Sequence, residues 1–108
     1  MIFITGPLYS GKREYACKIL GCQEAELKSR AIWDVQDLAA CHGDLKALAD
    51  ELSQYEVVIA TEIGGGVVPV DAGERAGREA AGRLSCLLAR RAEYVVRVFC
   101  GLPVVLKG

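Results

Sequence analysis

The feature that most constrains this chain is a glycine-containing turn that directly follows an apolar segment. Residues 6–12 read Gly-Pro-Leu-Tyr-Ser-Gly-Lys, a G-x-x-x-x-G-K spacing, after the apolar residues 1–5. Glycines let the backbone curl so that its N–H groups converge on an anion, and the following helix N-terminus adds partial positive charge. A lysine at this position reaches the outer phosphates of a nucleotide. The turn therefore predicts a phosphate-binding loop made of Gly6, Pro7, Leu8, Tyr9, Ser10, Gly11, Lys12 and Arg13.

Two details of this turn limit the prediction. The spacing also occurs by chance, in which case Lys12 is only a lysine at a helix start; its place between a strand and a helix favours phosphate binding. Arg13 stands where Ser or Thr normally follows the lysine, and that hydroxyl normally ligates the Mg²⁺ of the nucleotide. The segment thus predicts nucleotide binding and leaves catalysis open.

Composition narrows the class of protein. The chain has 108 residues, of which 52% are hydrophobic and 25% charged, with a net charge of −1. This size predicts a single domain over residues 1–108, and this charge predicts no attraction to nucleic acid or to a membrane surface. No apolar run approaches the roughly 20 residues of a membrane helix, and no charged segment precedes the first apolar run, so we expect a cytoplasmic protein. The five cysteines contain no C-x-x-C pair and are expected to be reduced, mostly buried thiols.

Hydrophobic periodicity predicts alternating strands and helices. We expect strands at residues 1–5, around 31–33, at 56–61, 94–100 and 104–106, and a turn at 101–103. We expect helices at 12–20, 37–41, 44–54 and 71 to about 92, with Gly21 ending the first and with Asp44 and Asp71 as N-caps. The β-branched run at 56–61 is typical of a strand covered on both faces. The pattern predicts an α/β fold, a P-loop NTPase-like layered domain with a small, mainly parallel sheet flanked by helices.

Glu62 is the first candidate outside the loop, because it closes the strand at 56–61. Nucleotide-binding enzymes commonly place a metal-binding or water-orienting carboxylate at such a strand end. We therefore name Glu62 as a catalytic and metal-binding candidate; the alternative is an acidic residue that faces solvent. The glycines that follow, including Gly64 and Gly66, permit close approach of the backbone to a substrate or serve a tight turn.

Two further sets of residues are candidates. Arg75 and Arg78 lie on one face of the long helix, where they would clamp a substrate phosphate or form a solvated basic face with neighbouring glutamates. His42, the only histidine, is a candidate nucleophile that would take up a nucleotidyl group. The alternative for His42 is an ordinary loop or helix histidine.

The C-terminal half carries more specific motifs. They are Glu-Ile-Gly-Gly-Gly-Val-Val-Pro at 62–69, Arg75 with Arg78-Glu79, Gly-Arg-Leu at 82–84, and Gly-Leu-Pro at 101–103 followed by Leu-Lys at 106–107. This set resembles the adenosylcobinamide kinase/adenosylcobinamide-phosphate guanylyltransferase family, and the loop at 6–13 matches the family's in position. The resemblance covers residues 1 to about 20 and 56 to 107.

The resemblance implies a nucleotide-dependent transferase of cobalamin biosynthesis. Such an enzyme phosphorylates adenosylcobinamide with ATP or GTP and then transfers GMP through a guanylylated histidine. It implies that Gly6, Ser10, Gly11 and Lys12 hold nucleotide phosphates and that Glu62 with its glycines lines the same cleft. It also implies a corrinoid substrate and a small homo-oligomer such as a trimer.

The chain also departs from the family pattern. The family's H-x-x-x-R-P-x-x-W segment is reduced to Arg-Ala-Ile-Trp at 30–33, and His42 follows this remnant instead of preceding it. Ser85-Cys86 replaces Asn-Gln, and no D-C-L-T motif is present, so we expect one core strand and its carboxylate to be missing. The alternative function is therefore a catalytically impaired nucleotide-binding or regulatory protein of the same family.

Overall fold

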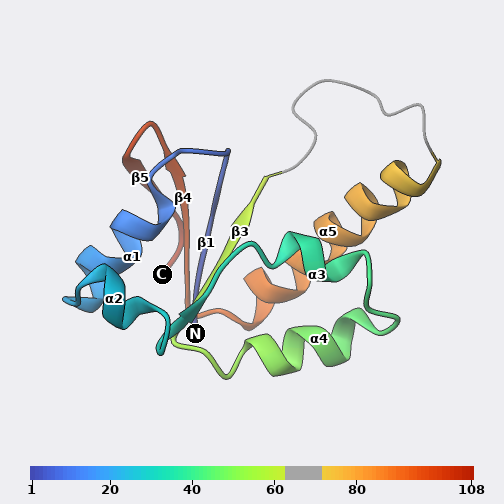
Figure 1. Cartoon of the computed structure of the whole chain (residues 1–108), viewed down its shortest axis with the longest axis horizontal. Helices are drawn as coiled ribbons and strands as arrows, with labels where there is room; N and C mark the ends of the chain where they lie inside the picture. Colours follow the sequence, from blue (N-terminus) through green and yellow to red (C-terminus); the bar gives the residue numbers. More distant parts are fainter. Residues whose placement is uncertain (63–71) are drawn as a thin grey trace.

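The computed structural model describes residues 1–62 and 72–108, which form one mostly parallel sheet between two groups of helices (Figure 1). The sheet has five strands in the order β2-β3-β1-β4-β5. They are β1 (Ile2–Gly6), β2 (Ala31–Ile32), β3 (Val57–Thr61), β4 (Tyr94–Phe99) and β5 (Leu102–Lys107). The first four run parallel, and β5 is antiparallel to β4. The predicted α/β fold with a mainly parallel sheet is confirmed.

Helices cover both faces of this sheet. They are α1 (Lys12–Leu20), α2 (Glu24–Leu27), α3 (Gln36–Ala39), α4 (Leu45–Leu52) and α5 (Ala72–Arg91). In Figure 1, α1 and α2 lie on one side of the strands and α3, α4 and α5 on the other. In the part of the chain that the structure describes, no helix is both long and apolar enough to cross a membrane.

The strands supply alternate side chains to two hydrophobic cores, because successive residues of a strand point to opposite faces. Phe3 and Val58 belong to the core under α4 and α5, together with Leu84 and Leu88. The other core, under α1 and α2, takes the neighbouring residues of the same strands. Its buried members are Ile4, Ala16, Leu27, Ala31, Val57, Ile59, Val96 and Val98.

Local signals set the helix ends where the sequence predicted them. Gly21 ends α1 in the left-handed conformation with φ of 66°, which glycine adopts at little cost. The Asp44 side chain accepts hydrogen bonds from the N–H groups of Lys46 and Ala47 and so caps α4. The predicted cap at Asp71 lies outside the described residues.

The C-terminal hairpin differs from the prediction. We expected a turn at 101–103, but the turn consists of Cys100 (φ 52°) and Gly101 (φ 74°), and β5 already begins at Leu102. Two successive positive φ values suit the right-handed twist of a two-residue hairpin. Pro103 is tolerated in β5 because this strand lies at the edge of the sheet.

Candidate functional site

The turn between β1 and α1 is fixed by close contacts with the C-terminal hairpin. A Cβ atom at Gly6 would lie 2.2 Å from the carbonyl oxygen of Val98, so no other residue fits there without a shift of backbone. Gly11 has φ of 90° at the start of α1, a value that favours glycine. The Gly101 N–H donates a hydrogen bond of 2.8 Å to the Ser10 carbonyl. The two glycines of the G-x-x-x-x-G-K spacing are thus required by geometry.

Lys12 points back into this turn. Its side chain is only 8% exposed, and Nζ donates to the Pro7 carbonyl at 2.6 Å and to Ser10 Oγ at 3.4 Å. Burial lowers the pKa of Lys12, while the Asp34 and Glu62 carboxylates act in the opposite direction. A partly desolvated ammonium inside a glycine-containing turn offers strong electrostatic binding to an anion.

A cleft of about 430 Å³ opens beside the turn. It lies at the carboxyl ends of β2 and β3. The carboxyl ends of parallel strands meet at one edge of a sheet and commonly form the ligand site. Its lining residues are Leu8, Tyr9, Ser10, Gly11, Lys12, Arg13, Glu14, Trp33, Asp34, Ile59 and Thr61. Six residues of the predicted phosphate loop are therefore brought together at one cleft.

Asp34 is a carboxylate in this cleft that sequence reasoning missed. It follows β2 closely and has φ of 58°, a conformation that aspartate tolerates better than most residues. The Thr61 hydroxyl donates to Asp34 Oδ1 at 3.4 Å, and the Thr61 N–H donates to Gln36 Oε1 at 2.9 Å. These contacts fix the end of β2 against the end of β3.

The strand expected around residues 31–33 is confirmed, whereas the expected loss of the strand that carries the D-C-L-T motif stays a prediction. The short strand Ala31–Ile32 is present next to β3, and Asp34 comes two residues after it. The signal was in the sequence, since an apolar segment at 31–33 is followed directly by an acidic residue.

Glu62 lies at the same edge but is engaged by an arginine. Its N–H donates to the Gly6 carbonyl at 2.9 Å, which places it next to the turn. Arg97 Nε donates to both carboxylate oxygens, at 2.9 and 3.1 Å, and the carboxylate raises the pKa of Arg97. The Arg97 guanidinium also lies 5.4 Å from the centre of the Phe99 ring. A metal ion would have to compete with this ion pair for Glu62.

Arg13 lies at the start of α1 and turns toward α2. Its guanidinium carbon is 5.4 Å from the centre of the Trp33 ring, and Nη1 is 3.9 Å from Glu24 Oε1. Both Arg13 and Trp33 line the cleft. Arg13 thus places a permanent positive charge beside the position where the hydroxyl of a phosphate-binding loop usually helps to hold Mg²⁺.

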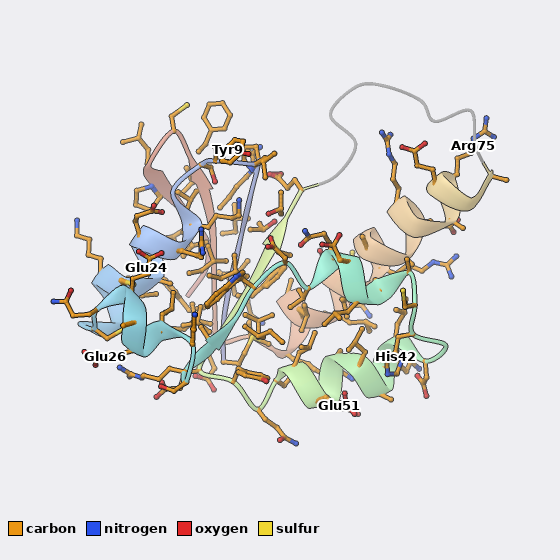
Figure 2. All side chains as sticks on the ribbon, viewed as in Figure 1. Tyr9, Glu24, Glu26, His42, Glu51 and Arg75 are labelled. Atoms are coloured by element: carbon orange, nitrogen blue, oxygen red, sulfur yellow. The ribbon has the colours of Figure 1, made fainter. Side chains whose placement is uncertain are left out.

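The remaining candidates are not brought to the cleft. In Figure 2, His42 and Arg75 lie on the far side of the molecule from Tyr9, His42 near α4 and Arg75 at the outer end of α5. His42 Nδ1 accepts a hydrogen bond from the Asp44 N–H at 3.2 Å. Arg78 lies one turn along α5 from Arg75. The substrate candidates Gly64 and Gly66 lie outside the described residues.

The described residues do not form a ready-made metal centre. Within residues 1–62 and 72–108, histidine, cysteine and acidic side chains make no group of three or more that could hold a metal ion. The acidic residues that line the cleft are Glu14 and Asp34.

A mostly parallel sheet flanked by helices, with a glycine-containing turn and a lysine after the first strand, defines a P-loop-like α/β protein. A comparison with known protein families identifies the family within this class. Residues 22–106 match the family described as cobinamide kinase / cobinamide phosphate guanyltransferase, and the chain belongs to this family. No match to a curated protein was found.

The family match bears on the function of residues 22–106 and does not include the turn at 6–13. Membership supports a kinase/guanyltransferase-like function in cobalamin biosynthesis, with nucleotide and cobinamide as the family's substrates. The matched segment begins at Cys22 and therefore includes Asp34 and Glu62. The turn at 6–13 precedes the matched segment, so phosphate binding there is supported by the geometry of Gly6, Gly11 and Lys12 alone.

Proposed function

We propose that this protein binds ATP or GTP at residues 6–13 and transfers the terminal phosphoryl group to the hydroxyl of a cobinamide. The observation that carries the proposal is the buried Lys12 ammonium, which is held 2.6 Å from the Pro7 carbonyl inside the turn. Nucleotide phosphates that enter the turn would replace the Pro7 carbonyl as the acceptor for this ammonium, and they would also accept hydrogen bonds from the N–H groups at the start of α1. Phosphoryl transfer is catalysed mainly by positioning and by electrostatic stabilisation of this kind.

We assign metal binding to Asp34 ahead of Glu62. Mg²⁺ bound to the nucleotide would neutralise charge on the phosphates, and Asp34 lines the cleft and is the carboxylate that raises the pKa of Lys12 most. Glu62 could bind the metal only after its ion pair with Arg97 is broken, so we assign to Glu62 the role of positioning the Arg97 side chain. Arg13 would add positive charge to the phosphates in place of the usual hydroxyl's metal contact.

The direct test is Mg²⁺-dependent transfer of labelled phosphate from ATP or GTP to adenosylcobinamide. Lys12→Ala should lower kcat/KM by at least about 10²-fold, because a desolvated cation on the transferring group is lost. Lys18→Ala is the matched control, since Lys18 is an exposed lysine in the last turn of α1. Equal activity of the Lys12→Ala variant and the unaltered protein would reject the proposal.

A second candidate is a nucleotide-binding or regulatory protein without turnover. Arg13 favours it, because the first-turn hydroxyl that normally ligates Mg²⁺ is absent. Isothermal titration would then give nucleotide binding that is weakened by Lys12→Ala, and no phosphate transfer would occur with Mg²⁺ or Mn²⁺. An unchanged melting temperature with ATP, GTP and GDP would exclude both candidates.

Guanylyl transfer through His42 stays a prediction. The place of His42 between α3 and α4 does not favour it, since the nucleotide would bind near Lys12. Intact-protein mass after incubation with GTP should show a GMP adduct that disappears in His42→Ala if His42 is the acceptor. Binding of the corrinoid by Arg75, Arg78, Gly64 and Gly66 is likewise a prediction, tested by the KM for cobinamide in Arg75→Ala and Arg78→Ala.

We also propose a cytoplasmic homo-oligomer such as a trimer. The support is the edge strand β5, in which Leu102 is 67% and Leu106 59% exposed, with Val104 and Val105 each about half exposed. An apolar edge strand of this kind readily pairs with another chain. Light scattering after size-exclusion chromatography measures the oligomeric state, and Leu106→Glu should shift it toward the monomer.

A further inference from the structure

Two of the five cysteines lie together at the C-terminal end of α1, away from the cleft. The Cys17 carbonyl accepts hydrogen bonds from the N–H groups of Gly21 and Cys22, the latter at 3.1 Å. In this capping geometry the residue after the left-handed glycine typically packs against the residue five positions earlier. Here those two residues are Cys22 and Cys17, and both side chains pack against the hydrophobic core beneath α1.

The backbone geometry satisfies the first requirement of a disulfide. A disulfide needs two Cα atoms within about 7 Å of each other. A direct hydrogen bond between the Cys22 N–H and the Cys17 carbonyl holds the two backbones within that reach. Burial raises the pKa of the Cys17 thiol, and the neighbouring Cys22 acts in the same direction.

The surroundings of the two sulfurs differ. Arg30 pairs with Glu56, which is the main cause of its raised pKa, and Cys22 acts in the same direction. Arg30 also donates to the Leu20 carbonyl at 3.4 Å, so its guanidinium lies at the end of α1. Both cysteines are partly exposed, so a small oxidant can reach them. By contrast Cys41, Cys86 and Cys100 are exposed and lie elsewhere in the chain, so the expectation of mostly buried thiols was wrong.

We propose that Cys17 and Cys22 form a dithiol site that closes to an intramolecular disulfide by exchange with a low-molecular-weight disulfide. The Cys22 thiolate attacks one sulfur of the reagent R–S–S–R, forms a mixed disulfide and releases one R–S⁻. Cys17 gives its proton to that leaving group, attacks the Cys22 sulfur and releases the second R–S⁻, which takes the proton lost earlier by Cys22. The protein gives up two protons and two electrons, and the reagent is reduced to two R–SH.

The second step is favoured because it is intramolecular. The capping turn holds the Cys17 sulfur next to the mixed disulfide at a high effective concentration, whereas a single exposed thiol has no such partner. We therefore expect the closed disulfide to exceed the Cys22 mixed disulfide by at least about tenfold at equilibrium with excess oxidised glutathione. This inference does not depend on the proposed nucleotide site.

The experiment treats the full-length protein with oxidised glutathione, blocks the remaining thiols and maps tryptic peptides without reduction. Trypsin cleaves after Lys18, so the disulfide appears as a linked pair of the peptides 14–18 and 19–28. Cys41, Cys86 and Cys100 are internal controls and should carry glutathione or the blocking group. The Cys17→Ser variant should accumulate one glutathione at Cys22, and the Cys22→Ser variant should not form the linked pair.

Intact mass gives an independent readout. In a Cys41→Ser, Cys86→Ser, Cys100→Ser variant, oxidation should remove the mass of two hydrogens and leave the protein in its original oligomeric state. Glutathione retained on Cys17 or Cys22, a disulfide between chains, or an unchanged reduced mass would each overturn the proposal. The three replacements lie at exposed positions, and circular dichroism of the variant verifies that it is folded.

Discussion

Asp34 and Glu62 are two carboxylates at the same edge of one sheet, and they differ in what holds them. Asp34 follows β2 and lines the cleft with Lys12, where the Thr61 hydroxyl donates to it. Glu62 follows β3 and is held by both of its oxygens on Arg97 Nε. A carboxylate already paired with arginine is a poor metal ligand, because binding the metal breaks the pair. Position at a strand end therefore does not by itself identify a catalytic carboxylate; its partners do.

The largest expected effect is a difference in enzymatic activity between variants of the two carboxylates. Asp34→Asn should lower kcat/KM for phosphate transfer to adenosylcobinamide by at least about 10²-fold, since the metal loses its protein ligand. Glu62→Gln should cost less than about tenfold, because its role is to hold Arg97. Steady-state kinetics at saturating Mg²⁺ measures both. Equal losses would mean that the two groups act alike and that the comparison is wrong.

A double variant tests whether Arg97 is what keeps Glu62 from binding metal. In the Asp34→Asn background, Arg97→Met should recover activity by about tenfold, because the freed carboxylate can then hold Mg²⁺ at the same edge. Arg97→Lys is the matched control, since it retains a cation beside Glu62. No recovery with Met, or equal recovery with Lys, would assign Glu62 a structural role only.

The two carboxylates should also differ in their effect on Lys12. Burial lowers the pKa of Lys12, and the Asp34 charge opposes this more than the Glu62 charge does. Nucleotide binding needs the protonated amine and is lost as pH rises through this pKa, so removal of either carboxylate should move the loss to lower pH. The shift should be larger for Asp34→Asn than for Glu62→Gln. Nucleotide affinity measured as a function of pH gives the two midpoints, and the reverse order would contradict the geometry.

The smallest expected effect concerns stability. The Glu62–Arg97 pair is exposed by 39% and 41%, so solvent screens it. Glu62→Gln should lower Tm by about 1–3 °C at low salt and by less at high salt. Calorimetry at two ionic strengths measures this. A larger loss that is insensitive to salt would mean that the pair supports the fold as well as the cleft.

Local signals predicted much of the fold. Gly21 and Asp44 end and begin their helices through contacts with residues only a few positions away, so the sequence shows them directly. The uninterrupted apolar run at 57–61 likewise predicted β3. The turn of the last hairpin was misplaced because Gly-Leu-Pro suggests a turn, whereas Cys100 takes a positive φ that its residue type does not favour.

The site was harder to predict because its contacts are long-range. The sequence suggested Glu62 as a metal ligand because it follows a strand. Its ion-pair partner Arg97 lies 35 residues away within an apolar strand, so the sequence did not show that the two residues pair. Asp34 was missed although a strand was expected around 31–33, because its contact with Thr61 and its place beside Lys12 are long-range. Lys12 and its turn were found because residues close in sequence make most of that turn.

The contact between Gly6 and Val98 also bears on the order in which the site forms during synthesis. The turn at 6–11 is synthesised about 90 residues before β4 and Gly101, yet its shape depends on β4 and on the Gly101 N–H. Loop closure across so many residues is slow compared with local helix formation. A nascent chain that lacks the final hairpin would therefore hold Lys12 in an unformed turn, and nucleotide could stabilise the fold only once the C-terminal strands have joined β1.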